Sequence, residues 1–552
     1  MRRNRFLWWL LLIYTAGLVG LACWFRHALN ADAVAYLRLA SYYAQGKWAL
    51  AVSGYWGPLA SWVMAVFLKL GLSPLPVARG FMCGSALVFL WGCVAVYRAF
   101  ELPEKWVTAG TALAAAASCY WSVQFITPDL LLSGLIGLAV SSMLRTNKPD
   151  TIGSSATAGL LWGLAYLTKA VAFPLALLVT LAVGVGALRN QSQSRSVRRR
   201  NAAVVLVVFS LVAAPWVLTL SLKYRAPTFS TTPRITHTLT GPPDAERYHP
   251  FGRTLHRPEA GRITSWEEPS RMAYNDWSPF ESPAYAWHQV EVVARNLSTC
   301  LALLTSLNVS WLALSFAWAL ESLRRRDLLT ATAGWGRALV PPSLLVLLYL
   351  PCYVTLTEQR FFYAAFPFLF SALALWSRTR ANGSQNEAIQ TKSPSARPTE
   401  SPARIPGDAT RIWWLAVLGA VVPLVAAVFV IGTTPKIAGE CAAELANRLA
   451  RANVSGPVAG SGMLPGGRAG LYVAYLLDQP WYGDKPRALP ADFQASGARL
   501  IIAVRGSELA GALAEDGGFA DLDSRLFAGP AEAAPFPLKA FKVREPRVAP
   551  NP

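Results

Sequence analysis

Apolar residues recur along the chain in long runs that are separated by shorter polar stretches. A helix needs about 20 apolar residues to cross the hydrocarbon core of a bilayer. The runs that predict such spans are 7–25, 76–98, 106–123, 128–145, 156–170, 171–188, 202–222, 297–320, 338–356, 362–377 and 412–433. The pattern therefore predicts a polytopic α-helical membrane protein with about 11 transmembrane helices.

The polar pattern between the spans predicts the domain organisation. Residues 379–410 are rich in Ser, Pro and charge without aromatic residues, which predicts a disordered linker. Residues 435–552 return to globular patterning, so the chain divides into a transmembrane part, 1–434, and a small α/β domain. Within this domain, strands are expected at GPVAG, ARLIIAVRG and LKAFKV, and helices at CAAELANRLARA and GLYVAYLLDQP.

The first polar segment, 26–75, contains two stretches with helical spacing. In the first, apolar positions recur from Asp32 onward, and Gly46 is placed to end the helix. The second, WGPLASWVMAVFLKLG (56–71), has Pro58 near its start and a single apolar stripe. It is too short to span a bilayer, so we expect interfacial helices that lie on the outer leaflet.

Composition and charge agree with a membrane protein. Of the 552 residues, 53% are hydrophobic and 15% are charged. The basic clusters MRRNR, RNQSQSRSVRRR (189–200) and RRRD (324–327) fall on one face of the predicted topology, so the N-terminus is expected in the cytoplasm and residues from 435 onward outside. Because these clusters border apolar helices, the net charge of +20 predicts contact with anionic lipid and no nucleic-acid partner.

Two motif types that bind cofactors are missing from the pattern. The seven cysteines have no CxxC spacing, so they predict neither a disulfide framework nor a zinc site. The glycine-rich stretch GSGMLPGGRAG matches neither dinucleotide nor P-loop spacing, and an ordinary turn between a strand and a helix is expected there. No cofactor is predicted; a divalent metal is possible but not indicated.

Two isolated acids stand at helix starts on the predicted outer face. Asp32 follows the first span, and Asp129 follows Thr127 and Pro128 in ITPDLLLSG. Each has an ordinary structural alternative, because acids are favoured as N-caps and in the first turn of a helix. As candidate catalytic residues, they would lie on one side of the membrane.

Two cations are expected on the same face. Lys169 lies at a break between two apolar runs, where snorkelling to the interface is the alternative. TEQRFFYAAFP (357–367) places Glu358, Arg360 and Tyr363 at the outer end of the tenth span. Arginine suits a phosphate because it donates two parallel hydrogen bonds. The acids and cations, with aromatic residues that include Tyr36 and Trp56, predict a site for a substrate with a lipid tail and a phosphate head.

The long outer loop 223–295 is a candidate lid or binding loop. It supplies His237, His249, Asp276 and Trp277 as candidate contacts to an acceptor or a sugar. The alternative is ordinary packing within the loop. Their spacing does not match that of metal ligands.

The order of these features resembles a known family. DAVAYLRLASYYAQGKWALAVSGYWGPLASWVMAVFLKLG, TPDLLL, LTKAVAFPL and EQRFFYAAFP follow one another as in the GT-C lipid-linked sugar transferases, in particular the protein mannosyltransferase and aminoarabinose transferase group. The resemblance covers residues 5–225 well and 337–377 moderately. The sequence departs from the Asp-Glu pair common in that group, because Ala33 follows Asp32.

The resemblance implies an inverting glycosyltransferase in a bacterial-type plasma membrane. A polyprenyl-phosphate sugar would be the donor, and an envelope lipid, glycan or protein on the outer face would be the acceptor. Asp32 would act as the base, and Lys169 and Arg360 would bind the donor phosphate. A transporter or lipid-linked-sugar flippase is the main alternative, and it would place its charges at mid-membrane. A non-catalytic scaffold is a third.

Overall fold

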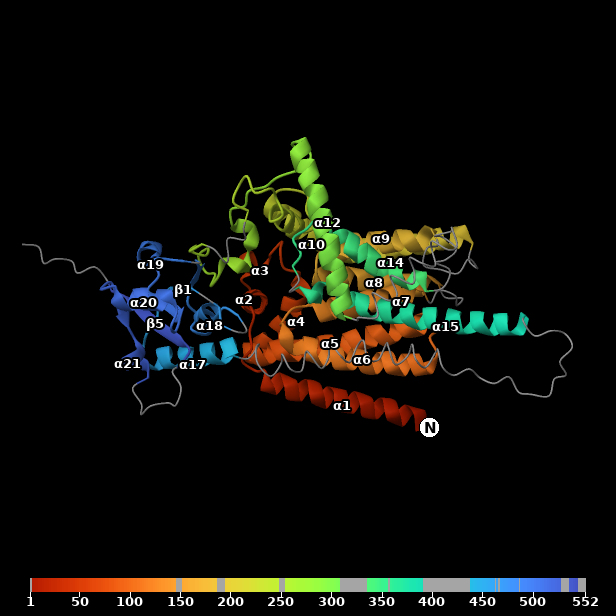
Figure 1. Ribbon diagram of the computed structural model, residues 1–552, viewed down its shortest axis with the longest axis horizontal. Coiled ribbons are helices and arrows are strands. Elements are labelled where there is room, and N and C mark those ends of the chain that lie inside the picture. The colour runs from red at the N-terminus through yellow and green to blue at the C-terminus, as the bar shows by residue number, and fades with distance from the viewer. Residues whose placement is uncertain are drawn as a thin grey trace, which may run out of the picture.

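The computed structural model describes residues 2–144, 151–185, 194–247, 254–307, 335–355, 358–390, 437–461, 463–464, 467–485, 487–527 and 536–544 of the 552-residue chain. Over these residues, apolar helices lie side by side in a bundle, and a small α/β domain lies at one end of it (Figure 1). The N-terminus lies at the opposite end of the bundle.

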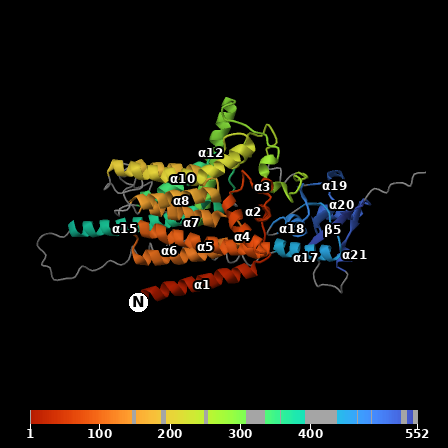
Figure 2. The same cartoon turned by 180° about the vertical axis from the view of Figure 1, so that it is seen from behind.

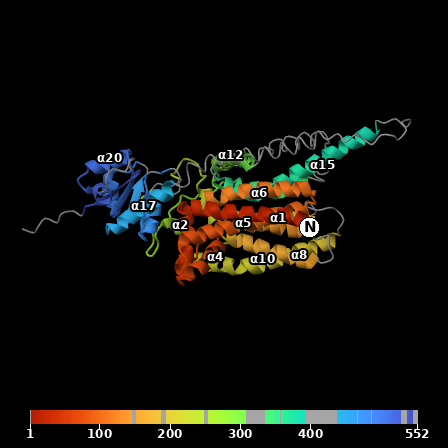
Figure 3. The same cartoon turned by 90° about the horizontal axis from the view of Figure 1, so that it is seen from below.

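Most helices of the bundle run along a common direction (Figures 1 and 3). They are α1 (Arg2–Trp24), α5 (Pro74–Ala99), α6 (Glu104–Gln124), α7 (Asp129–Leu144), α8 (Thr151–Thr168), α9 (Ala172–Val185), α10 (Arg195–Tyr224), α14 (Gly336–Tyr349) and α15 (Phe366–Gln390). By length and composition, four segments among the described residues suit a membrane span. They are α5, α10, α12 (Pro283–Leu307) and Gln359–Arg378, which consists of η4 (Gln359–Ala365) and the first part of α15.

Helix α12 departs from the common direction. In Figures 1 and 2 it is steeply inclined to the direction of α5, α6 and α15. It covers the first part of the predicted span 297–320, and residues 308–320 lie outside the described residues. The predicted span 412–433 also lies outside them.

Small residues let α5 and α7 approach closely. A Cβ atom added to Gly92 would lie 2.6 Å from the carbonyl oxygen of Gly134, and one added to Gly134 would lie 2.6 Å from that of Val88. Larger side chains at these two positions would push the helices apart, as expected for small-residue contacts between apolar helices. The contact fixes α7, whose first residue is Asp129.

The first outer segment forms the two expected helices, α2 (Ala31–Ala44) and α4 (Pro58–Lys69), with the single-turn α3 (Trp48–Ala51) between them. Pro58 occupies the start of α4, where its missing N–H costs nothing. Exposed apolar side chains of α4 include Val63, Val66 and Phe67. That face suits the interfacial position predicted for this helix, which remains a prediction.

The N-cap of α2 is Asn30, so the interpretation of Asp32 as an N-cap is wrong. Asp32 lies inside the first turn of α2. The side-chain oxygen of Asn30 accepts a hydrogen bond from the backbone N–H of Ile126, 2.9 Å away. Asn30 therefore joins the start of α2 to the segment that precedes α7 instead of capping its own helix.

Helix α15 extends into the segment predicted to be a disordered linker. Its backbone is helical as far as Gln390. Positions 379–390 therefore continue the helix. The rest of the predicted linker, 391–410, lies outside the described residues.

The loop predicted at 223–295, named the second outer segment, and the C-terminal domain supply the remaining elements. The outer segment contains α11 (Thr232–Thr238), η2 (Ser265–Glu267) and η3 (Pro269–Arg271). The domain contains α17 (Ile437–Arg451), β1 (Val458–Ser461), α18 (Ala469–Leu476), β2 (Trp481–Asp484), α19 (Pro490–Ser496), β3 (Leu500–Val504), α20 (Glu508–Glu515), β4 (Phe519–Asp521), α21 (Asp523–Leu526) and β5 (Leu538–Val543).

The C-terminal domain is a five-stranded mixed sheet in the order β2-β1-β3-β5-β4. Strand β1 pairs in parallel with β2 and β3, and β5 pairs antiparallel with β3 and β4. The predicted strands and helices correspond to β1, β3, β5, α17 and α18, and the glycine-rich stretch lies between β1 and α18 as expected. The short strands β2 and β4 were not predicted.

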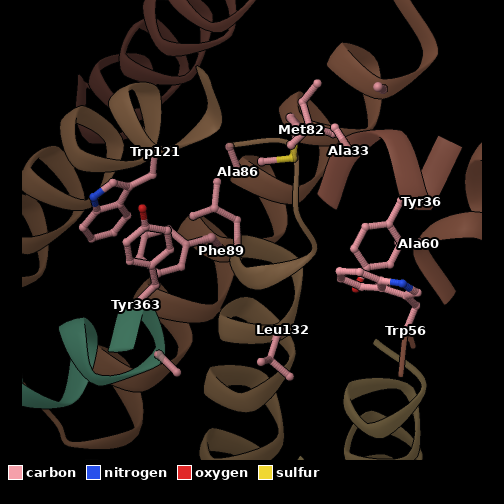
Figure 4. Packing of buried hydrophobic residues seen from close by; sticks show 14 of the residues in the cluster. Ala33, Tyr36, Trp56, Ala60, Met82, Ala86, Phe89, Trp121, Leu132 and Tyr363 are labelled. Atoms are coloured by element: carbon pink, nitrogen blue, oxygen red, sulfur yellow. The ribbon is translucent and has the colours of Figure 1, made fainter. Parts of the chain in front are cut away.

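The C-terminal domain packs directly on the outer segment of the bundle. Helix α17 starts beside the chain that leaves α1, and a Cβ atom added to Gly439 would lie 2.0 Å from the carbonyl oxygen of His27 (Figure 3). Arg38 of α2 donates to Asp478 of the domain at 3.0 Å. One buried core runs through both parts, and Figure 4 shows its section from Tyr36 and Trp56 to Trp121 and Tyr363.

Candidate functional site

Asp32 lies at the centre of a cluster of charged side chains at the end of the bundle that faces the C-terminal domain. Its Oδ2 atom accepts a hydrogen bond from Arg360 Nη1 at 2.6 Å. Its Oδ1 atom accepts one from Trp266 Nε1 at 3.0 Å. Both carboxylate oxygens therefore have a donor, and the side chain keeps 14% of its surface exposed.

Arg360 joins three carboxylates. It is the second residue of η4. Glu358 Oε2, from the N-cap position of this element, accepts a hydrogen bond from Arg360 Nε at 2.6 Å, and Asp32 accepts one from Nη1. Asp129 Oδ2 lies 4.0 Å from the same Nη1 atom. The guanidinium also faces the rings of Phe125 and Phe361 at 5.2 and 5.6 Å. The aromatic rings limit its freedom and shield the pairs from water.

Asp129 and Lys169 form the second pair of the cluster. Asp129 is the first residue of α7, and Lys169 lies in the turn between α8 and α9, as expected from the break between two apolar runs. Lys169 Nζ donates to Asp129 Oδ1 at 2.6 Å and lies 4.3 Å from the centre of the Phe361 ring. Asp129 Oδ2 is buried without a hydrogen-bond partner.

The structure therefore brings together five predicted residues, Asp32, Asp129, Lys169, Glu358 and Arg360, from four separate parts of the bundle. Three carboxylates against two cations leave one formal negative charge. Lys169 and Glu358 are the most accessible, with side chains 25% and 28% exposed. Electrostatic interactions are strong at such partly buried positions, because little water screens them.

The second outer segment places the side chain of Trp266 beside Asp32. Thr264 and Glu267 form a capping box at η2, so Trp266 lies in a tight turn. The rings of Tyr55 and Trp56 both lie 5.3 Å from the Trp266 ring, and Trp56 Nε1 donates to the Trp266 carbonyl oxygen at 2.8 Å. Trp266 was missed from the sequence, where its only signal was an aromatic residue beside two acids in the outer loop.

Glu267 and Glu268 hold the turn that contains Trp266 in place. Glu267 is completely buried and accepts hydrogen bonds from Tyr42 and from the backbone N–H groups of Ile263 and Thr264. Burial raises the pKa of the Glu267 carboxyl, and the nearby Arg38 and Arg262 guanidinium groups oppose this shift.

Glu268, also buried, binds Lys223 Nζ at 2.5 Å and the hydroxyl of Tyr224 at 3.0 Å. Lys223 and Tyr224 are the last residues of α10, so Glu268 ties the turn to the end of that helix. The two acids thus attach the second outer segment to α2 on one side and to α10 on the other.

Three predicted substrate contacts are packed inside the protein. Tyr36 and Trp56 are 4% and 7% exposed and pack against each other with ring centres 4.9 Å apart. Tyr363 stacks on Trp121 at 4.0 Å, and its hydroxyl donates to Gln124 (Figure 4). In this arrangement, the three rings belong to the buried core of the bundle.

The candidates in the second outer segment contact one another. The His237 ring stacks on Trp277 at 4.6 Å, and its Nε2 atom pairs with Gln289 of α12. Asp276 accepts hydrogen bonds from Arg234 and from Thr238 Oγ1. These contacts hold α11 against α12, which is the packing alternative considered for this loop. His249 lies outside the described residues.

A buried arginine joins the two chain segments that lead to the acids. Arg79 of α5 donates to the carbonyl oxygens of Ala28, four residues before Asp32, and of Val123, six residues before Asp129. Its side chain is buried, and desolvation of a guanidinium is costly unless its N–H groups are paired. The hydrogen bond from Ile126 to Asn30 lies beside this contact. Sequence reasoning missed Arg79, which stands near the start of an otherwise apolar span.

A metal site is not formed by the residues that the structure describes. Among them, no group of three or more His, Cys, Asp or Glu side chains could hold a metal ion. The charged cluster instead contains two cations, which suit an anionic group such as a phosphate.

The structural neighbours of this chain are GT-C glycosyltransferases, and they identify the fold. ArnT from Cupriavidus metallidurans in the apo state superposes with a TM-score of 0.51 at 17% identity, covering 96% of this chain and 97% of that chain. ArnT bound to undecaprenyl phosphate gives a TM-score of 0.50 at 15% identity, with the same coverage.

The apo oligosaccharyltransferase of Archaeoglobus fulgidus is also similar, with a TM-score of 0.49 at 12% identity over 90% of this chain and 69% of that chain. No family model matches the chain, and no curated protein matches it in sequence. The expected GT-C fold is therefore confirmed by the superposition on ArnT.

Proposed function

We propose that this protein is a membrane glycosyltransferase that moves a sugar from a polyprenyl-phosphate donor to an envelope acceptor on the outer face. The observation that carries this proposal is the cluster of Asp32, Asp129, Lys169 and Arg360 at one end of a GT-C bundle. The undecaprenyl phosphate bound to a protein of the same fold supports a donor of this kind.

Lys169 and Arg360 bind the phosphate of the donor. Charge-assisted hydrogen bonds to phosphate are about twice as strong as neutral ones. In the structure, both cations are occupied by carboxylates, so a phosphate replaces at least one carboxylate on Arg360. Lys169, with a quarter of its side chain exposed, is the more accessible of the two.

Binding of the donor prepares Asp32 to act as the base. When the phosphate takes Arg360 Nη1, Asp32 Oδ2 loses its donor and becomes available to an acceptor hydroxyl. The hydroxyl oxygen attacks the anomeric carbon, Asp32 takes its proton, and the bond from that carbon to the phosphate oxygen breaks. Polyprenyl phosphate leaves with the electron pair, and the anomeric configuration is inverted. Lys169 and Arg360 stabilise the leaving phosphate.

The position of the charged side chains favours a glycosyltransferase over a transporter or flippase. Asp32 lies in the first turn of α2, Asp129 begins α7, and Lys169 lies between two helices, so the cluster is at helix ends. A carrier or flippase would place such groups near the middle of its spans. The end that carries the cluster also carries the C-terminal domain, and we place both on the extracytoplasmic side of a bacterial-type plasma membrane, with the N-terminus in the cytoplasm.

Transfer by the purified protein tests this function. The full-length protein in lipid nanodiscs is incubated with radiolabelled polyprenyl-phosphate sugars and with envelope lipids, glycans or peptides, and loss of sugar from the donor is measured. Asp32→Asn is expected to lower the rate by about 10²–10⁴-fold, the usual contribution of a general base. The matched control is Glu515→Gln, an equivalent change from a carboxylate to an amide at an exposed position at the end of α20.

Folded wild-type protein that leaves every donor intact would contradict the proposal. Equal transfer rates in wild-type and Asp32→Asn protein would agree with a glycosyltransferase but would show that Asp32 is not its base.

A further inference from the structure

The charged cluster contains one carboxylate more than its cations neutralise. Asp32 pairs with Arg360 at 2.6 Å. Asp129 pairs with Lys169, also at 2.6 Å. The third acid, Glu358, lies 2.6 Å from the Nε atom of Arg360, whose guanidinium already binds Asp32. Glu358 therefore leaves the cluster with a net negative charge at the place where the proposed function requires an anion to bind.

Glu358 does not fill the ordinary structural role of an acid at its position. It is the N-cap residue of η4, an element that is described throughout, yet its side chain does not cap that element. Within the described residues, its carboxylate accepts one hydrogen bond, from Arg360 Nε, and 28% of the side chain is exposed. A glutamine would accept the same hydrogen bond through its amide oxygen. Orientation of the guanidinium therefore does not require the negative charge of Glu358.

The phosphate of the lipid gains charge during the proposed reaction. In the donor, it joins the polyprenyl chain to the sugar as a diester and carries one negative charge. Transfer breaks its bond to the anomeric carbon, so the product is a monoester, whose second ionisation has a pKa of about 6. The product therefore carries nearly two negative charges at neutral pH. Lys169 and Arg360 attract it more strongly than the donor, which slows its release.

We propose that Glu358 accelerates release of the polyprenyl-phosphate product by repelling the second negative charge of its phosphate, an inference that rests on the function proposed above. A phosphate on Arg360 Nη1 leaves Glu358 on the Nε atom of the same guanidinium, so the two anions lie on one planar group. The repulsion acts on one charge in the donor and on two in the product. Glu358 therefore lowers the affinity for the product more than the affinity for the donor.

The partly buried position of the cluster makes this repulsion strong. The Arg360 side chain is 12% exposed, and the rings of Phe125 and Phe361 face its guanidinium. Because little water screens the charges there, one nearby unit charge is expected to change the affinity for an anion at least about tenfold. Product release limits the turnover of many enzymes, so a carboxylate that weakens product binding raises kcat.

Binding of two lipids at two pH values tests this inference without any turnover. The probes are undecaprenyl phosphate and its methyl diester, titrated by microscale thermophoresis against full-length protein in nanodiscs at pH 8 and pH 5. At pH 8, Glu358→Gln is expected to bind the diester about tenfold and the monoester about 100-fold more tightly than wild type does. At pH 5 the monoester carries one charge, so equal gains are expected. The diester carries one charge at both pH values and controls for titration of the protein itself.

Kinetics and two further variants distinguish product release from a structural role. In Glu358→Gln, the steady-state kcat is expected to fall more than the single-turnover rate, because the product dissociates more slowly. Added undecaprenyl phosphate is expected to inhibit this variant more strongly than wild type. Glu358→Asp keeps the charge and is expected to keep the wild-type difference between the two lipids. The matched control, Glu515→Gln at an exposed position of the C-terminal domain, is expected to leave both affinities unchanged.

Equal gains for the two lipids at pH 8 would overturn the inference, since Glu358 would then not distinguish the product from the donor. Weaker binding of both lipids to Glu358→Gln would also overturn it and would show that the acid only orients Arg360. In either case, binding of the lipids by wild-type protein would leave the proposed donor site standing. Binding of neither lipid by wild-type protein would contradict that donor site, and this inference with it.

Discussion

The guanidinium of Arg360 lies 2.6 Å from the carboxylate of Asp32, although the two residues are 328 positions apart in the chain. Each belongs to the first turn after an irregular segment, Asp32 in α2 and Arg360 in η4. Their contact joins the outer segment that follows the first helix to the start of the last described helix of the bundle. In the proposed function, binding of the donor phosphate at Arg360 therefore breaks an existing ion pair.

Arg360 is expected to determine the affinity for the lipid phosphate. In Arg360→Lys, the planar fork that binds two oxygens is replaced by a single ammonium group. Undecaprenyl phosphate is expected to bind at least about tenfold more weakly, because a charge-assisted hydrogen bond is lost. Microscale thermophoresis on protein in nanodiscs measures the affinity.

The matched control for this change is Arg505→Lys, whose wild-type side chain pairs with Asp523 in the C-terminal domain. Unchanged phosphate affinity in Arg360→Lys, with the control also unchanged, would remove Arg360 from the donor site.

Trp266 is expected to orient Asp32 for proton transfer. Trp266→Phe keeps a ring against Tyr55 and Trp56 but removes the hydrogen bond to Asp32 Oδ1. We expect kcat to fall about tenfold, equivalent to a hydrogen bond to a charged group at about 1.5 kcal/mol, with little change in the donor KM. Steady-state kinetics with a radiolabelled donor measures both constants.

Trp48→Phe serves as the control, since Trp48 is exposed and packs on Tyr43 away from Asp32. An equal loss of kcat in both variants would show that the effect is not specific to the Asp32 contact.

Arg79 is expected to act as a positioning residue. In Arg79→Met, the carbonyl oxygens of Ala28 and Val123 lose their shared donor, and the segments that lead to Asp32 and Asp129 become free to separate. Leaving buried polar groups unpaired is expected to lower the free energy of unfolding by about 1–3 kcal/mol. A fall in kcat at unchanged donor KM is expected, with partial rescue in Arg79→Lys.

Thermal unfolding and kinetics together check this prediction. Arg98→Met, at the exposed last turn of α5, is the control. A loss of stability without any loss of kcat in the folded fraction would show that Arg79 is structural alone.

The stability of the outer segment is expected to depend on pH through Glu267. Burial raises its pKa above the ordinary value of 4.5, so the folded protein holds this proton more tightly than the unfolded chain. Stability from this group is complete below the ordinary pKa and is lost as the pH rises through the folded value. Glu267→Gln has no proton to lose.

The thermal midpoint of Glu267→Gln, relative to wild type, is therefore expected to increase as the pH rises from 4.5 toward neutrality. Differential scanning fluorimetry across this range measures the difference. A difference that falls with pH would mean that the pairs with Arg38 and Arg262 outweigh the cost of burying the charge.

Much of the candidate site could be predicted from residue type and position. Asp129 and Lys169 were recognisable because an acid at a helix start and a lysine at a break between apolar runs stand out against a lipid-facing sequence. Arg360 stood out in the same way. Trp266 and Arg79 were not recognisable, since a tryptophan in an outer loop and an arginine near the end of a span are both common in membrane proteins.

The roles of some aromatic residues also depended on packing. Tyr36, Trp56 and Tyr363 were expected to face a ligand, whereas the structure buries them against one another or against Trp121. Their spacing along a helix reveals which face they share but not what covers that face.

The amino-acid sequence by itself determined the apolar helices among the described residues of the bundle and three strands of the C-terminal sheet. These features follow from local periodicity and from the apolar solvent that the helices require, which act over a few neighbouring positions. Only the tertiary structure decided that Trp266 and Arg360 share Asp32 and that Arg79 joins the two acid-bearing segments. Those contacts join distant parts of the chain, so their geometry depends on how whole helices pack.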